Sequence, residues 1–204
     1  MRIIYPPRPS GKIPPKILPK YEKRGRHLAQ RKFNGHRNLV HVTPGGMVSI
    51  YGRHGGEHGS YKMARPLRED LSDLNFEKGK EYWIDGELLH PRVPDTVVLY
   101  DVLQAGAYLY GVTIEERLDL LTHICRNPTA RPDPSIALQC SQHVWMADTF
   151  LDQFPGHFQE FIDLDLIEGL VLKERGSRLN GYGYKHYEVN WQIRCRKPGA
   201  SYGY

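Results

Sequence analysis

Residues 187–196 carry the cleanest alternation of apolar and polar side chains in this sequence of 204 residues. Apolar residues stand at positions 189, 191, 193 and 195, and polar residues stand at positions 190, 192, 194 and 196. Because side chains alternate between the two faces of a strand, the pattern predicts a strand with one face on a core and one polar face. Residues 97–103 are nearly all apolar and predict a strand that is buried on both faces. The chain must therefore build a β-sheet that other elements cover.

Other patterns predict the remaining elements. Strands are predicted at residues 38–42 and 47–51, which form a hairpin around a Pro-Gly-Gly turn, and at residues 82–88, 136–140 and 168–173. Thr113 and Glu116 form a capping box for a helix that ends near Arg126. Residues 142–154 and 157–163 predict two helical pieces that Pro155-Gly156 separates. Together the elements predict an α+β fold in which helices flank antiparallel sheets.

Six prolines, at positions 6, 7, 9, 14, 15 and 19, fall within one short basic stretch. Proline fixes φ and lacks an amide donor, so residues 6–19 are predicted to form an extended arm, not a helix or a central strand. The arm would lie either on the domain or along a nucleic acid backbone. We therefore divide the chain into an arm of residues 1–20 and one domain of residues 21–204, which is long enough to bury a good core.

The net charge of +5 is unevenly distributed along the chain. Residues 1–37 hold eleven Lys or Arg against one acid, residues 38–172 hold ten against twenty, and residues 173–204 hold seven against two. The three segments therefore carry +10, −10 and +5. Basic ends around an acidic middle suit a protein that grips phosphates while its carboxylates hold a divalent cation, although a basic balance also serves solubility alone.

Composition argues against several classes of protein. No apolar run approaches the roughly 20 residues that span a membrane, and residues 1–7 lack the apolar core of a signal peptide. Three cysteines without a Cys-x-x-Cys pair argue against a disulfide scaffold or a zinc knuckle. No Walker-type loop occurs, and residues 181–183 lack the third glycine of a dinucleotide fingerprint. We expect a protein of the cytoplasm or another reducing compartment, with no membrane partner.

Residues 30–37, Gln-Arg-Lys-Phe-Asn-Gly-His-Arg, place a lysine before a tight turn and an arginine after it. A lysine that attacks a phosphate must be uncharged, whereas a free lysine is almost fully protonated at neutral pH. Neighbouring cations, here Arg31, Arg37 and a bound metal, favour the uncharged amine. We therefore interpret Lys32 as a candidate nucleophile toward a nucleoside triphosphate. Taken alone, Lys32 is more simply explained as a solvated lysine in a basic segment.

Later residues supply other groups that such chemistry needs. Glu87 and Glu168 each lie beside a glycine in a predicted strand, where their carboxylates are candidate ligands for Mg²⁺. Tyr100 offers an aromatic face to an adenine base. The simpler explanations are strand-end carboxylates and a core tyrosine. His54 and His58 lie in a glycine-rich loop that cannot hold them on one helix face, so we expect exposed histidines more than a metal pair.

In this order the stretches resemble the motifs of the covalent nucleotidyltransferase superfamily, which includes ATP-dependent DNA ligases, RNA ligases and mRNA capping enzymes. The signature Lys-x-Asp-Gly-x-Arg is similar to residues 32–37, and an arginine-glycine element after a hairpin is similar to residues 52–55. The later motifs are matched by residues 85–87 (Asp-Gly-Glu), 100–101 (Tyr-Asp), 168–173 (Glu-Gly-Leu-Val-Leu-Lys) and 194–196 (Arg-Cys-Arg). The resemblance covers about residues 28–197, and its strength lies in the ordered set.

The resemblance implies a fold and a reaction. The fold would be the ligase- or capping-type nucleotidyltransferase domain, which is ATP-grasp-like, with no OB-fold domain in this chain. ATP would place AMP on Lys32 with Mg²⁺ or Mn²⁺, AMP would pass to the 5′-phosphate of a nick, and the 3′-hydroxyl would seal it. Residues 99–103 and the glycines and helix that follow look most like DNA ligases of replication and repair. RNA ligase is the second reading and capping guanylyltransferase the third.

The resemblance also implies a role for each residue. Lys32 would carry AMP through a phosphoramidate, Gln30 would help to recognise adenine, and Tyr100 would stack on the base. The ribose would be held by Arg37 and Glu87, the metal by Glu87 and Glu168, the α-phosphate by Lys173, Arg194 and Arg196, and the nucleic acid backbone by Arg53.

The sequence departs from the family pattern at several positions. Asn34 stands where aspartate is usual, which removes a negative charge beside the nucleophile, and arginines at 194 and 196 replace two lysines and present a planar fork. The sequence stops at Tyr204, soon after the last motif, so we expect an excised domain, a minimal ligase or a protein that borrows a clamp or OB-fold partner. Glu168 and Lys173 would face opposite ways on a regular strand, so a turn or bulge at residue 169 is predicted.

The partner would be nicked double-stranded DNA or RNA, bound by a monomer. The competing hypothesis is a non-catalytic nucleic-acid-binding module of the same fold. Asn34 and the absent C-terminal domain favour that module, whereas the intact Lys32, Glu87, Glu168 and Lys173 favour the enzyme.

Overall fold

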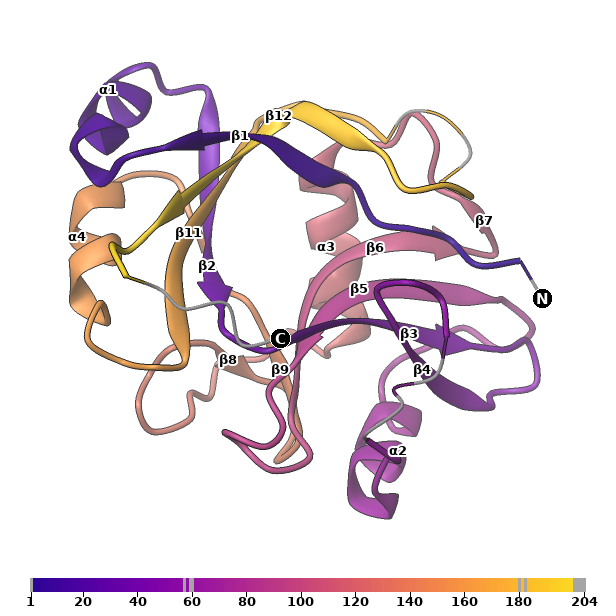
Figure 1. Ribbon diagram of the computed structural model, residues 1–204. Helices are drawn as coiled ribbons and strands as arrows, with labels where there is room; N and C mark the ends of the chain where they lie inside the picture. Colours follow the sequence, from indigo (N-terminus) through magenta and orange to yellow (C-terminus); the bar gives the residue numbers. More distant parts are fainter. Residues whose placement is uncertain (1, 57, 59–60, 180, 182, 200–204) are drawn as a thin grey trace.

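The computed structural model describes residues 2–56, 58, 61–179, 181 and 183–199. Its strands form two sheets that both contribute to the wall of one cavity, and helices pack on the sheets from outside (Figure 1). The first sheet has the order β1-β12-β11-β2-β10, made of Arg8–Ile13, Glu188–Arg196, Ile167–Glu174, His27–Phe33 and Thr149–Phe150.

The second sheet has the order β4-β3-β5-β6-β9-β8, and β7 pairs with β6. Its strands are Val48–Gly52, His36–Val42, Tyr82–Leu88, Val97–Ala105, Val144–Met146, Leu138–Gln139 and, for β7, Ala107–Tyr108. The paired strands run antiparallel except in the β1–β12 and β6–β9 pairs, which are parallel. The predicted α+β fold with antiparallel sheets is confirmed, and the two parallel pairs are an addition that the sequence did not indicate.

Four α-helices and one short 3₁₀ segment occur in the described part of the chain: η1 Pro15–Ile17, α1 Leu18–Lys23, α2 Arg65–Ser72, α3 Ile114–Ile124 and α4 Phe154–Glu160. Leu18 of α1 and Phe158 of α4 pack against Leu170 on the first sheet. α2 and α3 pack on the second sheet through Leu67 and Leu121. The main apolar cluster of each sheet thus lies on the side of its helices, and the opposite face of the second sheet carries a smaller apolar cluster, with Leu39, Trp83 and Leu103, beside the polar groups of the cavity.

Helix α3 confirms the predicted capping box. The Thr113 side chain accepts a hydrogen bond from the Glu116 amide, and the Glu116 carboxylate accepts one from the Thr113 amide. The buried stripe of the helix also contains a charge, because the Arg117 side chain is fully buried and pairs with Asp101 of β6 through two bonds of 2.9 Å. This ion pair fixes α3 to the strand that carries Tyr100.

The helix predicted at residues 142–154 is wrong, and so is its break at Pro155. Residues 144–146 form β9 beside β6, and α4 begins at Phe154 with Pro155 in its first turn. Proline is favoured at that position because the first helical amides lack partners in any case. The strand predicted at 136–140 is shorter than expected, since β8 contains only Leu138–Gln139. Helix α2 was not predicted.

The proline-rich stretch is partly extended, as predicted, and partly helical. Residues 8–13 form β1 at the edge of the first sheet, but residues 15–23 form η1 and α1 (Figure 1). Pro15 and Pro19 both stand in the first turn of these segments, where a missing amide donor costs nothing. The sequence prediction treated every proline as incompatible with a helix and therefore missed η1 and α1, in which proline stands in the first turn.

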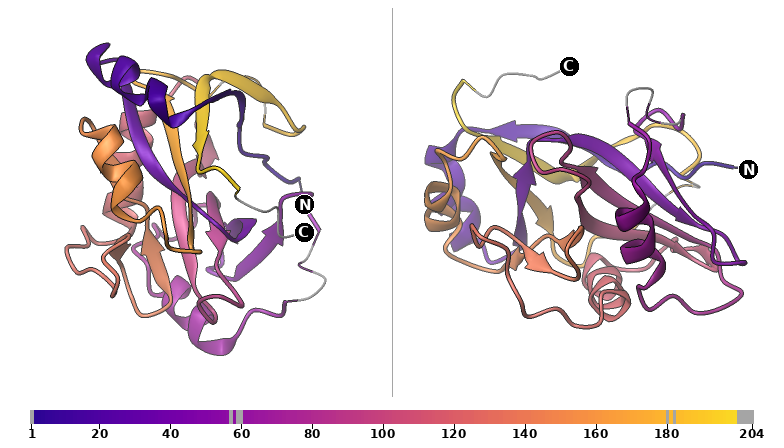
Figure 2. Two further views of the ribbon diagram at one scale, coloured as in Figure 1. Left: turned by 60° about the vertical axis from the view of Figure 1, so that its left-hand side comes forward. Right: turned by 90° about the horizontal axis from the view of Figure 1, so that it is seen from below.

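The two sheets are joined directly by the turn at residues 34–35, which connects β2 to β3 (Figure 2). A Cβ on Gly35 would collide with the Leu88 carbonyl oxygen and lie 2.8 Å from Glu87 Cγ, so the turn requires glycine.

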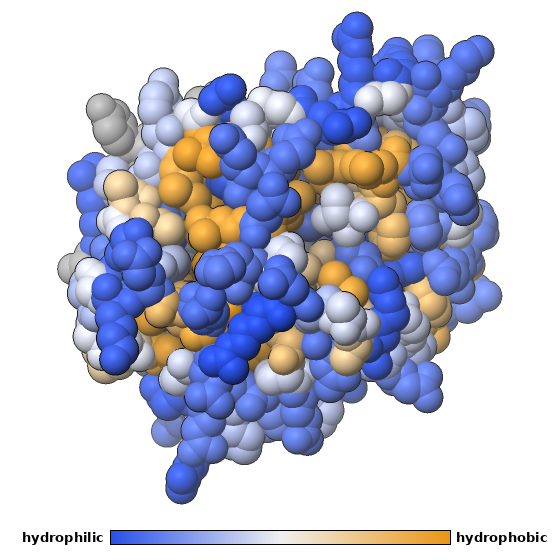
Figure 3. Space-filling view, turned by 180° about the vertical axis from the view of Figure 1, so that it is seen from behind, coloured by the Kyte–Doolittle hydropathy of each residue, from blue (hydrophilic) through white to orange (hydrophobic). Residues whose placement is uncertain are grey.

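From behind, apolar surface is visible between many hydrophilic side chains (Figure 3). Among the residues described, we find no helix that is both long and apolar enough to cross a membrane.

Candidate functional site

A cavity of about 660 Å³ is lined by residues of both sheets. Its wall takes in β2, β11 and β12 of the first sheet, β3, β5 and β6 of the second, and part of β1. All the residues that the sequence proposes for the site line this one cavity: Gln30, Lys32, Arg37, Arg53, Glu87, Tyr100, Glu168, Lys173, Arg194 and Arg196. The structure therefore brings together residues from six separate stretches of sequence, while the role of each stays a prediction.

Lys32 is held by a carboxylate. Its Nζ lies 2.6 Å from Glu168 Oε2, and the Lys32 side chain is 19% exposed. Arg196 Nε lies 3.2 Å from the same oxygen. The amine was expected in a purely cationic environment, and the ion pair corrects that expectation.

Gly169 solves the register problem of Glu168 and Lys173. The pairing of β11 with β2 shifts between Ile167 and Gly169, and Gly169 has a φ of 140°. A Cβ at this position would collide with the Cys195 carbonyl oxygen. The predicted irregularity is confirmed, and because of it both Glu168 and Lys173 line the cavity.

Arg37 on β3 is fixed by Asp85 on β5. The Arg37 Nε and Nη2 groups donate to the two carboxylate oxygens of Asp85. Burial acts to lower the pKa of Arg37, but the charge and hydrogen bonds of Asp85 outweigh it, so the pKa is raised. Asp85 was not proposed as a site residue, although its place in the Asp-Gly-Glu motif on the Glu87 side of the strand was a signal for it.

Two buried groups of the cavity have strongly shifted pKa values. Burial raises the pKa of Glu87 to about 7, against the opposing charges of Lys32 and Arg37. Burial also lowers the pKa of Lys173 to about 8, although the carboxylates of Asp101 and Asp85 oppose it. Such shifts cluster where groups must change charge during a reaction. Both residues lie in the wall of the proposed site.

Gln30 and Tyr100 form one end of the cavity. Gln30 Nε2 donates to the Tyr100 carbonyl oxygen and to Thr149 Oγ1, each at 3.4 Å. Gln30 Oε1 is buried and has no partner among the described residues. A buried acceptor without a partner is costly, so this amide suits a ligand that donates a hydrogen bond, such as a base with an exocyclic amine.

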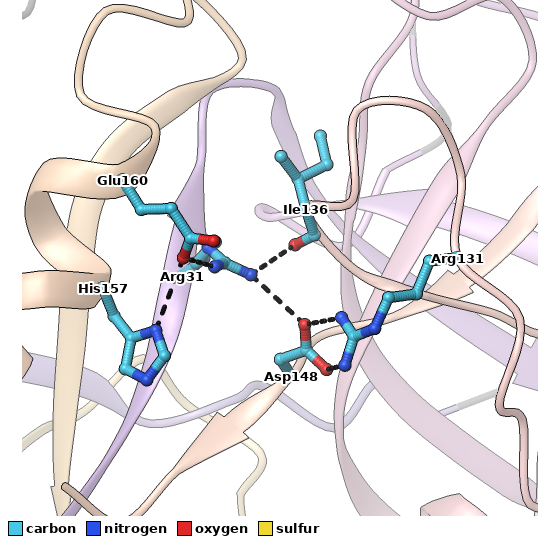
Figure 4. A network of polar contacts seen from close by, with 6 residues as sticks. All are labelled: Arg31, Arg131, Ile136, Asp148, His157 and Glu160. Carbon is cyan, nitrogen blue, oxygen red and sulfur yellow. Dashed lines mark hydrogen bonds and ion pairs between the residues drawn. The ribbon is translucent and has the colours of Figure 1, made fainter. Parts of the chain in front are cut away.

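Arg31 also lines the cavity, but its guanidinium belongs to a buried polar network (Figure 4). It donates to the Ile136 carbonyl oxygen and to Asp148, both at 3.2 Å, and to Glu160 at 2.6 Å. Arg131 donates to both oxygens of the same carboxylate, including the Oδ2 atom that Arg31 contacts. Alternate side chains of a strand face opposite ways, so the expectation that Arg31 acts on Lys32 is corrected.

Asn34 makes a local contact that an aspartate could not make. Its Nδ2 donates to the Asp165 carbonyl oxygen at 2.9 Å, and its backbone amide donates to the Leu166 carbonyl oxygen at 2.8 Å. The side chain thus fixes the turn after Lys32 to the segment before β11. The departure from the family motif therefore has a structural reason.

A metal would find two candidate carboxylates in the cavity. In the described part of the chain no group of three or more His, Cys, Asp or Glu side chains is arranged to hold a metal ion. Magnesium is usually bound by one or two carboxylates together with substrate phosphates. Glu87 and Glu168 line the same cavity and fit a metal that arrives with a nucleotide.

Residues that the sequence did not propose also line the cavity. Arg8 comes from β1, His36 and His58 lie near the hairpin, and His54 and His186 lie near Arg8. Apart from His36, which begins β3, these residues come from loops and from the edge strand β1, where no periodicity marks a buried face. His54 is exposed and His58 is half-buried.

Together the two sheets, the lysine turn and the shared cavity define the fold class of ligase-type nucleotidyltransferase domains. No protein-family model and no curated protein sequence matches the chain. Solved structures do match it, at 11–18% sequence identity, so they show the fold and not the activity.

The solved structures with a similar fold include DNA ligases. The ligase domain of LigD from M. tuberculosis is 18% identical, with a TM-score of 0.61 over 93% of this chain and 58% of that chain. A mycobacterial DNA ligase D in complex with ATP and MES is 16% identical, with a TM-score of 0.61 over 95% of this chain and 60% of that chain. The ATP-dependent DNA ligase from bacteriophage T7, in complex with ATP, is 11% identical, with a TM-score of 0.55 over 91% of this chain and 67% of that chain. This chain spans about three fifths of the two LigD chains.

Proposed function

We propose that this chain is the catalytic domain of an ATP-dependent DNA ligase. The observation that carries the proposal is the convergence of Lys32, Glu87, Glu168 and Lys173 on one cavity between two sheets. The predicted roles were assigned from motif order, and the cavity supports the proposal because a lysine, two carboxylates and several cations line one nucleotide-sized space. We further propose residues 21–204 as the adenylation domain and residues 1–20 as its arm.

In the first step Lys32 Nζ attacks the α-phosphorus of ATP. A nitrogen–phosphorus bond forms, the bond from that phosphorus to the bridging oxygen breaks, and pyrophosphate leaves. One ammonium proton passes to Glu168, whose Oε2 lies 2.6 Å from Nζ, and the second, released when the nitrogen–phosphorus bond forms, leaves with pyrophosphate. A general base at hydrogen-bonding distance typically contributes 10²- to 10⁴-fold to such a step.

Cations of the cavity would stabilise the charge that develops on the phosphates. Lys173, Arg194 and Arg196 line the cavity on β11 and β12, and guanidinium forks match phosphate oxygens well. A bound Mg²⁺ or Mn²⁺ would supply further positive charge between the phosphate oxygens. Glu87 and Glu168 would hold it.

The other end of the cavity would hold the nucleoside. Gln30 would accept a hydrogen bond from the adenine amine through Oε1, and Tyr100 would stack on the base. Arg37 and Glu87 would hold the ribose, with Arg37 kept in place by Asp85. Two neighbouring chain segments on β2 and β3 would thus orient both the base and the sugar.

In the later steps AMP would pass to the 5′-phosphate of nicked DNA, and the 3′-hydroxyl would displace it. Arg53 lines the cavity in the loop after β4 and would contact the nucleic acid backbone. A separate clamp or OB-fold partner would enclose the duplex, and the catalytic unit would be a monomer. RNA ligase is the alternative, in which the same lysyl-AMP serves an RNA end.

The test is incubation with α-labelled ATP and Mg²⁺ or Mn²⁺, followed by a denaturing gel. We expect wild-type protein to retain label and Lys32→Ala to retain none, with Lys12→Ala as the control for loss of a lysine. Labelling by GTP instead would indicate capping chemistry. Nicked DNA and nicked RNA duplexes then distinguish the two ligases. No label with any metal would contradict the proposal and favour a non-catalytic module.

A further inference from the structure

Two buried carboxylates of the second sheet are each held by the fork of one arginine. Helix α3 lies against β6 and carries the fully buried Arg117 (Figure 1). Arg117 Nε and Nη2 donate to the two oxygens of Asp101 on β6, each at 2.9 Å. Arg37 on β3 donates in the same way to both oxygens of Asp85 on β5. Each carboxylate thus has both oxygens occupied by one guanidinium, which is the strongest form of this pairing.

Lys173 of β11, in contrast, is a buried cation without a partner. Only 5% of this residue is exposed, and its amine forms no hydrogen bond or ion pair with another residue in the described part of the chain. Its neighbours in the sheet, Leu28 on β2 and Gln192 on β12, bring no charge. A buried charge without a counter-charge is unfavourable, and Lys173 lines the cavity. An anion that enters the cavity would supply the missing partner.

Charged groups act on Lys173 from four elements that pack around it. Burial lowers the pKa of Lys173 to about 8. The carboxylates of Asp101 on β6 and Asp85 on β5 oppose this shift, whereas the guanidinium groups of Arg117 on α3 and Arg37 on β3 add to it. Asp101 has the largest effect of the four. It is therefore the carboxylate that would pair with Lys173 if Arg117 did not hold it.

We propose that Arg117 is a positioning residue for the nucleotide site. By occupying both oxygens of Asp101, it prevents this carboxylate from pairing with Lys173, so the amine stays free to contact a phosphate of the ligand. Arginine suits this role because its planar fork takes both oxygens at once, whereas lysine offers only a point charge. The ligand rests on the proposed function, but the competition of Arg117 and Lys173 for Asp101 does not.

The competition can be measured without a nucleotide. The readout is the stability that Lys173 contributes, measured by urea unfolding of each variant with and without Lys173→Met. In the wild type this contribution should rise between pH 8 and 10.5, because the folded pKa of Lys173 is lowered. In Arg117→Gln, Asp101 is released to pair with Lys173 and the pKa of the amine increases, so the rise should shrink to about half or less. In the double variant Asp101→Asn/Arg117→Gln the carboxylate is absent, so the rise should be at least as large as in wild type.

The consequence for the ligand is measured with α,β-methylene-ATP and Mg²⁺ at pH 6.5, by calorimetry. This analogue cannot transfer AMP, because it lacks the bridging oxygen beside the α-phosphorus. Arg117→Gln should bind it about tenfold more weakly, because Asp101 draws Lys173 away from the phosphates. Removal of the competing carboxylate in the double variant should restore the affinity to within about threefold of wild type. Arg65→Gln, which removes an exposed, ion-paired arginine from α2, is the control and should bind like wild type.

Each result has a distinct reading. An unchanged pH-dependent rise in Arg117→Gln overturns the competition, and an unchanged affinity overturns its consequence for the ligand. A double variant that binds as weakly as Arg117→Gln overturns the proposal as well, because a merely structural pair is not repaired by removal of its second partner. If Arg117→Gln does not fold, Arg117→Lys replaces it, with smaller effects expected in the same directions. If wild type does not bind the analogue, the proposed function fails, and the nucleotide-free readout still decides whether Arg117 keeps Asp101 from Lys173.

Discussion

Lys32 on β2 and Glu168 on β11 form an ion pair inside the cavity, with Nζ and Oε2 2.6 Å apart. The contact depends on the irregular pairing at Gly169, which turns Glu168 toward the strand that carries the lysine. The proposed nucleophile and its proton acceptor are thus joined before any nucleotide enters. Four measurements follow from this and from the other contacts of the cavity.

Glu168→Gln should slow nucleotide labelling of Lys32 by about 10²-fold or more, because the amide keeps the shape of the side chain but cannot take a proton. The measurement is the rate of label incorporation from α-labelled ATP. Glu174→Gln is the matched control, since Glu174 lies at the exposed end of the same strand. A rate within threefold of wild type would contradict the role of Glu168.

Gly169→Ala should destabilise the protein by more than about 3 kcal/mol, because the new Cβ meets the Cys195 carbonyl oxygen and φ is 140°. Urea unfolding measures the change. Gly156→Ala in α4 is the control, because a Cβ there has open space and ordinary φ, and we expect little effect. Equal stabilities for the two variants would show that the β11 backbone relaxes freely.

Lys173 should make the protein more stable as the pH rises through its own titration. Its folded pKa of about 8 lies below the usual value of 10.5, so the charged form is disfavoured in the folded state below pH 8. This penalty is relieved between pH 8 and 10.5 and amounts to at most about 3 kcal/mol. The free energy of unfolding of Lys173→Met, relative to wild type, should therefore fall over that interval. A constant difference across it would mean that Lys173 titrates normally.

Asn34→Asp restores the usual motif residue and should still destabilise the protein by about 1 kcal/mol at pH 7. The carboxylate cannot donate to the Asp165 carbonyl oxygen, and it adds a second negative charge near Asp165. Urea unfolding is the measurement, and Asn190→Asp on the exposed face of β12 is the control. If adding Asp165→Asn restores part of the stability that Asn34→Asp loses, repulsion between the two carboxylates is a cause of the loss. If Asn34→Asp is more stable than wild type, the hydrogen bond from Asn34 does not stabilise the turn.

Much of the fold could be predicted because its strands have strong local patterns. The alternation at 187–196 correctly indicated a strand with a polar face, and Gln192, Arg194 and Arg196 of that face line the cavity. The capping box of α3 and the irregularity at Gly169 followed from local rules as well. The helix predicted at residues 142–154 was wrong because residues 144–146 become the strand β9 by pairing with β6, and no local sequence pattern indicates that pairing.

Residues of the candidate site could be predicted where they belong to a sequence motif. They could not be predicted where their position depends on tertiary packing. Motif order proposed Lys32, Glu87 and Glu168, which line one cavity, but it did not indicate the ion pair between Lys32 and Glu168, because an ion pair between two strands depends on register. Arg117 and Arg31 are buried charges that look like surface residues in a sequence. Arg8 was hidden in a stretch whose prolines indicated only an extended arm.

The parallel pairing of β1 with β12 has a consequence for biosynthesis. Arg8 pairs with Glu188 and Ile13 pairs with Cys195, so this sheet edge closes only after residues 188–195 have left the ribosome. Contacts between such distant positions form late in folding. A nascent polypeptide that does not yet include β12 therefore lacks the wall that β1 and β12 supply, and its cavity is incomplete.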